Sequence, residues 1–214
     1  MHPFVFPHHL YPIIDTLGQS QRSHLDIAEA MLATGVRLLQ LRLKDRPTRE
    51  FVDLARAVQV RAVACGAALI INDRTDIALL VGAAGVHLGQ TDLPAADARE
   101  LLGPQAIVGV STHTPEQALA AAREGVANYL GFGPIYATGS KADPDPVQGL
   151  TGLQRARAAI DLPLVAIGGI TLATASEVLA AGADAVAVIR DVVAARDVRA
   201  RVAEFLSLDA GAAG

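Results

Sequence analysis

The sequence lacks the features that mark several broad classes of protein. It has one cysteine, Cys65, so no disulfide can form within the chain, which fits a reducing compartment. Cys65 lies in a helix-like apolar run, and we expect it to be a buried, inert thiol. The 18 Lys and Arg residues are dispersed without a basic block, and the net charge is -4, so the footprint of a nucleic-acid-binding protein is missing.

Targeting and membrane signals are also scarce. The opening stretch MHPFVFPHHL lacks a basic region and is interrupted by Pro3 and Pro7, so we do not expect a signal peptide. Every uncharged stretch falls short of the roughly 18 apolar residues that a membrane span requires. We therefore expect a cytoplasmic protein with neither a membrane nor a nucleic-acid partner. With 51% hydrophobic residues, the sequence predicts one domain over residues 1–214, with a flexible arm at 1–9 and a flexible tail at 208–214.

A repeated pattern predicts the fold class. An alanine-rich amphipathic segment is followed by glycine, a short connection and a β-branched apolar run, as in the αβ loops of a parallel sheet. These glycines are Gly35, Gly66, Gly82, Gly103, Gly125 and Gly182. The expected strands are Leu10–Ile14, Val36–Leu41, Ala68–Ile71, Gly85–Leu88, Ile107–Val110, Tyr129–Phe132, Leu164–Ile167 and Ala185–Ile189.

Eight strands alternating with helices predict a single (β/α)₈ barrel, although 214 residues is short for a fold of typically about 250. Helical spacing is clear at Phe51, Ala55 and Val58, and Thr114 with Gln117 predicts a capping box. The alternative is an open, doubly wound sheet. Its usual GxGxxG dinucleotide motif is absent after the first strand.

Polar residues gather where the expected strands end. In a barrel these carboxyl ends meet on one face, where active sites lie. The residues in question are Asp15, Gln40, Arg42, Lys44, Asn72, Asp73, Gln90, Asp92, Ser111, Thr138–Lys141, Gly168, Gly169 and Arg190. The residues that enter the strands are mostly Gly, Ala and Pro. This asymmetry predicts a site on one rim.

Two acidic residues follow neighbouring expected strands. Asp73 and Asp92 would bring two carboxylates within reach of one cation, and Mg²⁺ is often held by two carboxylates, water and phosphate oxygens. Arg42, Lys44 and Lys141 would add positive charge for a diphosphate. The alternative is that Asp73 caps a helix and that the basic residues are solvated. Because all five charged residues are expected on one rim, a metal and diphosphate site is the favoured interpretation.

A second phosphate site is expected after the seventh and eighth strands. Gly168 and Gly169 expose backbone N–H groups beside a helix that begins near Thr171, and Arg190 ends the eighth strand. Two phosphate sites indicate two phosphorylated substrates. His87 and His113 are near the rim, where a lone histidine is more often structural, and we assign neither a catalytic role.

Six motifs in order resemble the thiamine phosphate synthase family, from Leu10 to about Val193. They are QLRLKD at 40–45, IIND at 70–73, GVHLGQTD at 85–92, GVS at 109–111, GFGPIYATGSK at 131–141 and IGGI at 167–170. The resemblance implies a (β/α)₈ transferase that joins a hydroxymethylpyrimidine diphosphate to a thiazole phosphate and releases diphosphate with Mg²⁺.

The resemblance also implies roles for individual residues. Asp73 and Asp92 correspond to metal ligands, and Arg42, Lys44, Ser111 and Lys141 to catalytic residues. The substrate-binding positions are Gln40, Leu41, Arg42, Leu43, Lys44, Asn72, Ser111 and Lys141 for the pyrimidine diphosphate, and Thr138, Gly139, Ser140, Gly169, Ile189 and Arg190 for the thiazole phosphate. The reaction needs no protein nucleophile, which fits the lack of an activated Ser or Cys arrangement.

Some positions depart from the family pattern. Leu43 replaces a common acidic residue, Thr174 a common Asn, and Arg190 a usual Ser. We expect Arg190 to clamp the thiazole phosphate. A related branch of thiazole tautomerases typically has His where this chain has Pro134. That activity and a non-catalytic, metabolite-binding regulatory barrel are the alternatives.

Overall fold

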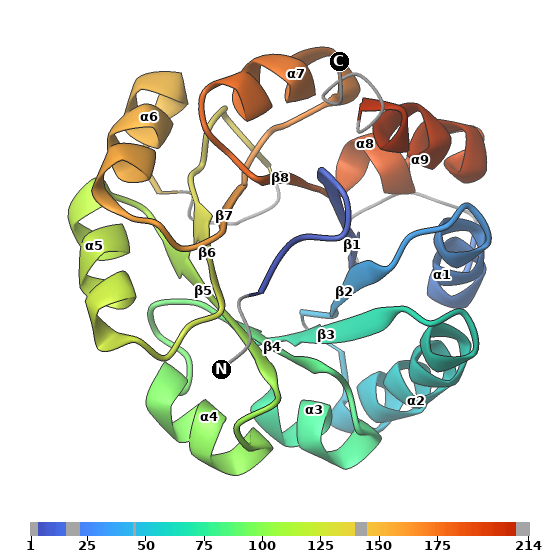
Figure 1. Cartoon of the computed structure of the whole chain (residues 1–214). Helices are drawn as coiled ribbons and strands as arrows, with labels where there is room; N and C mark the ends of the chain where they lie inside the picture. Colours follow the sequence, from blue (N-terminus) through green and yellow to red (C-terminus); the bar gives the residue numbers. More distant parts are fainter. Residues whose placement is uncertain (1–3, 16–21, 45, 140–144, 209–214) are drawn as a thin grey trace.

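The computed structural model describes residues 4–15, 22–44, 46–139 and 145–208. Eight parallel strands pair in chain order and close into a barrel, seen end-on in Figure 1. The strands are β1 (Leu10–Asp15), β2 (Leu38–Arg42), β3 (Ala68–Asn72), β4 (Gly85–Leu88), β5 (Ile107–Thr112), β6 (Tyr129–Phe132), β7 (Leu164–Ala166) and β8 (Ala185–Val188). Closure occurs between β8 and β1, where Leu10 pairs with Val186. The predicted (β/α)₈ barrel is confirmed, and the open doubly wound sheet is excluded.

Helices surround the barrel (Figure 1). They are α1 (His24–Ala33), α2 (Thr48–Ala64), α3 (Thr75–Val81), α4 (Ala95–Leu102), α5 (Pro115–Glu124), α6 (Gly149–Ala159), α7 (Leu172–Ala180), α8 (Arg190–Val193) and α9 (Val198–Leu206). In α2, the predicted apolar face of Phe51, Ala55 and Val58 is buried. Within the ranges given above, no helix is both long enough and apolar enough to span a membrane.

Strand side chains alternate between two apolar clusters. One lies between the strands and the helices and includes Leu39, Leu41 and Ile71. The other fills the barrel interior and includes Tyr11, Ile70, Tyr129 and Val165. Because successive residues of a strand point to opposite faces, neighbours such as Ile70 and Ile71 belong to different clusters. This alternation decides which predicted site residues face the cavity above the interior.

Two local predictions differ from the structure. Cys65 follows the last turn of α2 and is exposed rather than buried. Thr114 caps α5 by accepting the backbone N–H of Gln117, at 3.2 Å. The side chain of Gln117, however, accepts the backbone N–H of His113 at 2.7 Å, so the predicted capping box is replaced by a bond one residue earlier. The preceding loop is thereby tied to the start of the helix.

The described part of the N-terminal arm packs against the barrel. Phe6 is 8% exposed, and its ring contacts Tyr129 with a centroid distance of 5.2 Å. Phe4 stacks on the same tyrosine at 5.3 Å. Residues 4–9 therefore differ from the expected flexible arm, because their aromatic rings cover apolar side chains inside the barrel. Residues 1–3 and most of the expected tail, 209–214, lie outside the described residues.

The barrel interior predicts a strong effect of one added methyl group. A Cβ on Gly109 would lie 2.2 Å from Cζ of Tyr129 and 2.6 Å from Nδ1 of His87. We expect Gly109→Ala to lower the free energy of unfolding by roughly 2–3 kcal/mol, because overpacking displaces buried rings. Urea denaturation measures this loss.

Gly125→Ala is the matched control, because its Cβ would meet nothing within 4 Å and only its left-handed backbone, with φ 67°, is unfavourable for alanine. That strain costs about 1 kcal/mol. A loss at Gly109 no larger than that at Gly125 would contradict the packing of the interior.

Candidate active site

A cavity of about 860 Å³ lies at the carboxyl ends of the strands. Most of the predicted site residues line it: Gln40, Arg42, Lys44, Asn72, Asp73, Asp92, Ser111, Thr138, Gly139, Gly169, Ile189 and Arg190. They come from all parts of the sequence and meet because parallel strands of a barrel end on one face. The predicted residues Ser140 and Lys141 lie outside the described residues.

Leu41 and Leu43 do not line this cavity. Both are buried in the cluster between strands and helices, at 0% and 7% exposure. Their neighbours Gln40, Arg42 and Lys44 point into the cavity, because side chains alternate along β2 and the residues that follow it. The predicted contact of Leu41 and Leu43 with substrate is therefore corrected: these side chains pack beneath the helices. The apolar burial also explains why a leucine is accommodated at position 43.

Asp73 and Asp92 form a carboxylate pair at one end of the cavity. Asp73 does not cap α3, whose N-cap is Arg74 without a side-chain bond. It has a φ of 62°, a left-handed conformation that few residues other than glycine adopt. Burial, together with a hydrogen bond and repulsion from Asp92, raises the pKa of Asp73 to about 6. A nearby cation would stabilise the ionised form of a carboxylate in this environment.

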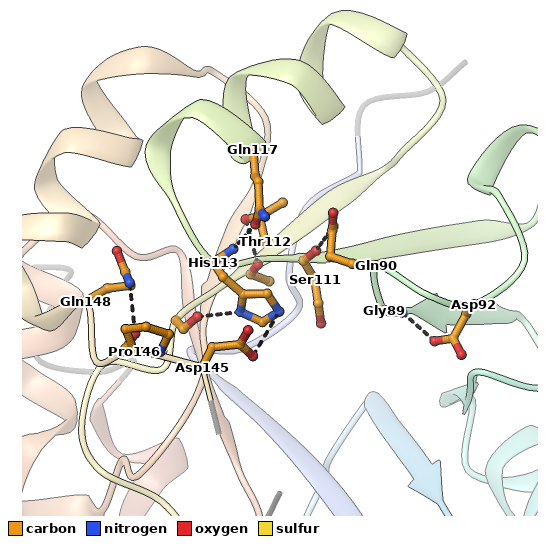
Figure 2. A network of polar contacts seen from close by, with 12 residues as sticks. Gly89, Gln90, Asp92, Ser111, Thr112, His113, Gln117, Asp145, Pro146 and Gln148 are labelled. Carbon is orange, nitrogen blue, oxygen red and sulfur yellow. Dashed lines mark hydrogen bonds and ion pairs between the residues drawn. The ribbon is translucent and has the colours of Figure 1, made fainter. Parts of the chain in front are cut away.

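Both carboxylates have further partners that orient them. Lys44 Nζ lies 3.5 Å from Asp73 Oδ2. Asp92 Oδ2 accepts the backbone N–H of Gly89 at 2.6 Å, a bond drawn in Figure 2. A Cβ on Gly89 would lie 3.0 Å from this oxygen, so a glycine allows the loop to fold back on the carboxylate. The pair is thus held in place by the loop that follows β4 (Gly85–Leu88) and by a cation from the loop after β2.

Arg42 is held by a buried acid. Its guanidinium donates to Oδ2 of Asp15, whose side chain is 0% exposed. Asp15 ends β1 and Arg42 ends β2, and the two are paired in register. Fixing a guanidinium by one carboxylate leaves its planar donors preoriented, so less rotamer entropy is lost when an anion binds. The sequence analysis singled out Asp15 because it ends a strand, but it did not predict the ion pair with Arg42.

The opposite end of the cavity is formed by the turns after β7 and β8. Gly168 and Gly169 both have positive φ, at 91° and 69°. A Cβ on Gly168 would lie 2.4 Å from Cβ of Pro134, and one on Gly169 would lie 2.7 Å from the carbonyl oxygen of Ala137. The glycine pair therefore allows close contact with the loop after β6, in addition to exposing backbone near α7.

Arg190 faces the same end. Its Nη2 would lie 3.2 Å from a Cβ built on Gly139, so the guanidinium lies against the loop that carries Thr138. Arg201 also lines the cavity, and its Nη1 lies 3.5 Å from Oδ2 of Asp191. Asp191 in turn accepts the backbone N–H of Leu172 at 2.9 Å. Positive charge is therefore present at both ends of the cavity.

His113 joins two loops at the rim. Figure 2 shows its imidazole beside Asp145, with Nε2 3.4 Å from the carboxylate. Nδ1 lies 2.7 Å from the carbonyl oxygen of Gly133. This histidine connects the end of β5 to the segment that leads into α6. His113 also lines the cavity, and its structural role stays a prediction.

The sequence analysis missed a polar group inside the barrel. The hydroxyls of Tyr11 and Tyr129 are 2.9 Å apart, and the latter lies 3.0 Å from Nδ1 of His87. Nε2 of His87 lies 2.8 Å from Oγ of Ser111. The strand alternation that places Gln40 inside the barrel would also have placed Tyr11 and Tyr129 there. Their mutual contacts depend on barrel register, which no local pattern contains.

The fold and this cavity define a (β/α)₈ barrel protein with a site for small molecules, with acidic and basic groups at one end of the cavity and a glycine turn with arginine at the other. Comparisons with known proteins agree. Residues 10–192 match the family described as thiamine monophosphate synthase. The thiamine-phosphate synthase of Moorella thermoacetica is 49% identical, over 89% of this chain and 90% of that protein. That of Methanoculleus marisnigri is 46% identical over the same shares.

A solved structure shows the same likeness in three dimensions. The thiamine phosphate pyrophosphorylase from Pyrococcus furiosus has a TM-score of 0.85 and 35% identity, and the match covers 96% of each chain. The chain therefore belongs to the thiamine monophosphate synthase family and, with it, to the transferases of thiamine biosynthesis. The resemblance inferred from six motifs is confirmed.

The carboxylate pair predicts that the negative charge of Asp73 destabilises the folded protein when no metal ion is bound. Because the pKa of Asp73 is raised from 3.8 to about 6, the ionised form is less favourable in the folded state than in the unfolded state. We expect Asp73→Asn to stabilise the protein by about 1–2 kcal/mol at pH 8, after allowance for the lost contact with Lys44. The gain should shrink as the pH falls through 6 and vanish below about 4, where aspartate is protonated in both states.

Urea denaturation in the presence of a chelator measures this difference. Asparagine is chosen because it tolerates the left-handed backbone at position 73. Asp53→Asn, at an exposed position of α2, is the control and should change stability by less than about 0.5 kcal/mol. If Asp73→Asn instead lowered the free energy of unfolding at pH 8, the ionised carboxylate would stabilise the folded protein, and the prediction would be wrong.

Proposed function

We propose that this enzyme joins a hydroxymethylpyrimidine diphosphate to a thiazole phosphate and releases diphosphate with the help of Mg²⁺. The supporting observation is one cavity of about 860 Å³ with a basic, anion-binding group at each end. Arg42 and Lys44 lie at the end that carries the carboxylate pair, and Arg190 with Gly169 lies at the other. Two phosphorylated substrates bound at these ends would meet in the middle of the cavity.

The residues at the first end fit Mg²⁺. Asp73 and Asp92 are close enough to share a hydrogen bond, and their repulsion is relieved when a divalent cation replaces the proton. Over the described ranges, no group of three or more His, Cys, Asp or Glu residues is placed to hold a metal. A small hard ion bound by two carboxylates would complete its coordination with water and diphosphate oxygens. When bound, it would neutralise charge on the departing diphosphate.

The reaction exchanges one carbon–oxygen bond for one carbon–nitrogen bond. The bond between the pyrimidine methylene carbon and diphosphate breaks, and its electron pair leaves with the diphosphate oxygen. The electron-rich aminopyrimidine stabilises the resulting cation, and the thiazole nitrogen then donates its lone pair to the methylene carbon. Arg42, fixed by Asp15, and Lys44 would stabilise the leaving group, while the cavity holds the partners in line.

An assay of the two substrates tests this proposal. We expect thiamine phosphate and diphosphate to form in equal amounts with Mg²⁺, and little product with a chelator. Asp92→Asn should lower kcat/KM by at least about 100-fold, because one cation ligand and its charge are lost. Asp97→Asn, on α4, is the control. Full turnover without a divalent cation, or by the Asp92 variant, would refute the metal assignment.

Arg190 predicts a separate effect at the second end. A guanidinium that binds the thiazole phosphate contributes charge-assisted hydrogen bonds. We expect Arg190→Ser to raise the KM for thiazole phosphate by roughly ten- to 100-fold, with little change in the KM for the pyrimidine diphosphate. Arg199→Ser, at an exposed position of α9, should alter neither. An unchanged or lower KM for thiazole phosphate in the Arg190 variant would mean that this side chain crowds the site.

The alternatives predict different outcomes in the same assay. A tautomerase would convert the thiazole phosphate alone, but the position that typically carries histidine in that branch is Pro134, which lines the cavity. A regulatory barrel would bind both ligands without turnover. The synthase names of the relatives favour neither alternative. The cytoplasmic location remains a prediction, supported by an exposed thiol at Cys65 that a reducing compartment would keep free.

A further inference from the structure

A chain of hydrogen bonds crosses the inside of the barrel from β2 to β5. Gln40 Nε2 donates to the hydroxyl of Tyr11 at 3.0 Å. The chain continues through the hydroxyl of Tyr129 and the ring of His87 to Oγ of Ser111, over distances of 2.9, 3.0 and 2.8 Å. Its two end residues, Gln40 and Ser111, line the cavity, and so do Tyr11 and His87 at its floor. The middle of the chain is buried, since Tyr11, Tyr129 and His87 are 1%, 0% and 6% exposed.

The neighbouring strands leave room for this chain. A Cβ on Gly109 would lie 2.5 Å from the hydroxyl oxygen of Tyr129. One on Gly131 would lie 3.2 Å from Cε1 of His87. The imidazole is also stacked on the ring of Tyr129, with centroids 5.5 Å apart. The rings can therefore approach one another only because two inward positions, on β5 and β6, carry no side chain.

Each phenol has one proton to donate, and the distances between Tyr11, Tyr129, His87 and Ser111 allow the chain to run in either of two directions. Burial raises the pKa of Tyr11 and Tyr129 well above the usual value, so both stay protonated. Tyr11 accepts from Gln40, and in one of the two directions its own proton goes to Tyr129. In that direction Tyr129 donates to Nδ1 of His87, which is then the unprotonated nitrogen of a neutral ring. The ring proton is left on Nε2 and is donated to Ser111.

We propose that the chain runs in this direction and that Tyr11, Tyr129 and His87 are positioning residues that fix the hydrogen-bonding character of both its ends. Gln40 is thereby committed to present its amide oxygen to the substrate, and Ser111 its hydroxyl proton. The backbone of Ser111 is held independently, since Gln90 Nε2 donates to its carbonyl oxygen at 2.6 Å (Figure 2). Only the direction in which the hydroxyl donates is left for His87 to decide.

The substrate class follows from these two ends, and this step rests on the proposed function. An amide oxygen accepts the N–H of an exocyclic amine, and the second N–H of the same amide reaches an adjacent ring nitrogen, as when Gln pairs with adenine. The Ser111 proton suits an acceptor, either a ring nitrogen or a phosphate oxygen. An aminopyrimidine with an anionic substituent matches both ends. A pyrimidinone with a carbonyl in place of the amine would meet the Gln40 oxygen with a second acceptor and bind poorly.

The first test does not depend on turnover. In protein labelled with ¹⁵N-histidine, the ring nitrogens of His87, assigned by their loss in His87→Gln, report the tautomer at neutral pH. We expect a proton on Nε2 and none on Nδ1. Tyr129→Phe should shift the ring to a mixture of tautomers, while Tyr136→Phe, which removes a hydroxyl bonded to Glu177 outside the chain, should leave the spectrum unchanged. A proton on Nδ1 in the unmodified protein would reverse the direction and overturn the proposal.

The second test uses kinetics and keeps the proposal falsifiable if Tyr129→Phe fails to fold. Tyr11→Phe removes the acceptor of Gln40 and leaves Tyr129 able to donate to His87. We expect the His87 tautomer to be retained and the KM for the pyrimidine diphosphate to rise roughly three- to tenfold, the value of one hydrogen bond. The KM for thiazole phosphate should not change. An equal rise in both KM values, or none, would refute positioning by Tyr11. A wild-type protein without synthase activity would refute the proposed function and leave the tautomer result standing.

Discussion

The narrow interior of the closed barrel is the constraint on which the rest of this structure depends. Eight short strands enclose a space that side chains must fill completely, so every inward position is matched to those opposite it. Tyr11 and Tyr129 occupy this space with hydroxyls 2.9 Å apart, and Gly109 gives them room. The buried ring of Phe6 packs against both tyrosine rings. The floor of the cavity is thus rigid and carries polar groups only where these are hydrogen-bonded to one another.

The packed barrel interior supports a high density of charged side chains at the carboxyl ends of the strands. Carboxylates and guanidinium groups project from the strand ends, and several are held by a partner from a neighbouring strand or loop, as Arg42 is by Asp15. Asp73 shows the cost of the arrangement, because its left-handed backbone and raised pKa both oppose folding. Binding of a cation and an anionic substrate would recover this cost. Under the proposed function, the site would therefore gain affinity for charged ligands from strain that the folded barrel supports.

The sequence predicted the barrel and most of the rim because both follow from patterns of short range. Strand alternation, helix-capping glycines and polar strand ends are local, and they correctly brought Asp73 and Asp92 to one cavity. The resemblance to a family placed Leu41 and Leu43 at the substrate, although the alternation of side chains along β2 and the residues that follow it turns both away from the cavity. The arm at Phe6 and the chain through His87 could not be predicted, since each depends on which inward residues meet across the barrel.

The central claim is that one cavity binds two phosphorylated groups at opposite ends, with the pyrimidine between Gln40 and Ser111. A crystal structure with thiamine phosphate, diphosphate and Mg²⁺ bound tests it most directly. The account predicts a metal ion between Asp73 and Asp92, the phosphate of thiamine phosphate beside Gly169 and Arg190, and the pyrimidine amine at the amide oxygen of Gln40. A metal ion held elsewhere, or thiamine phosphate bound in the reverse orientation, would contradict it.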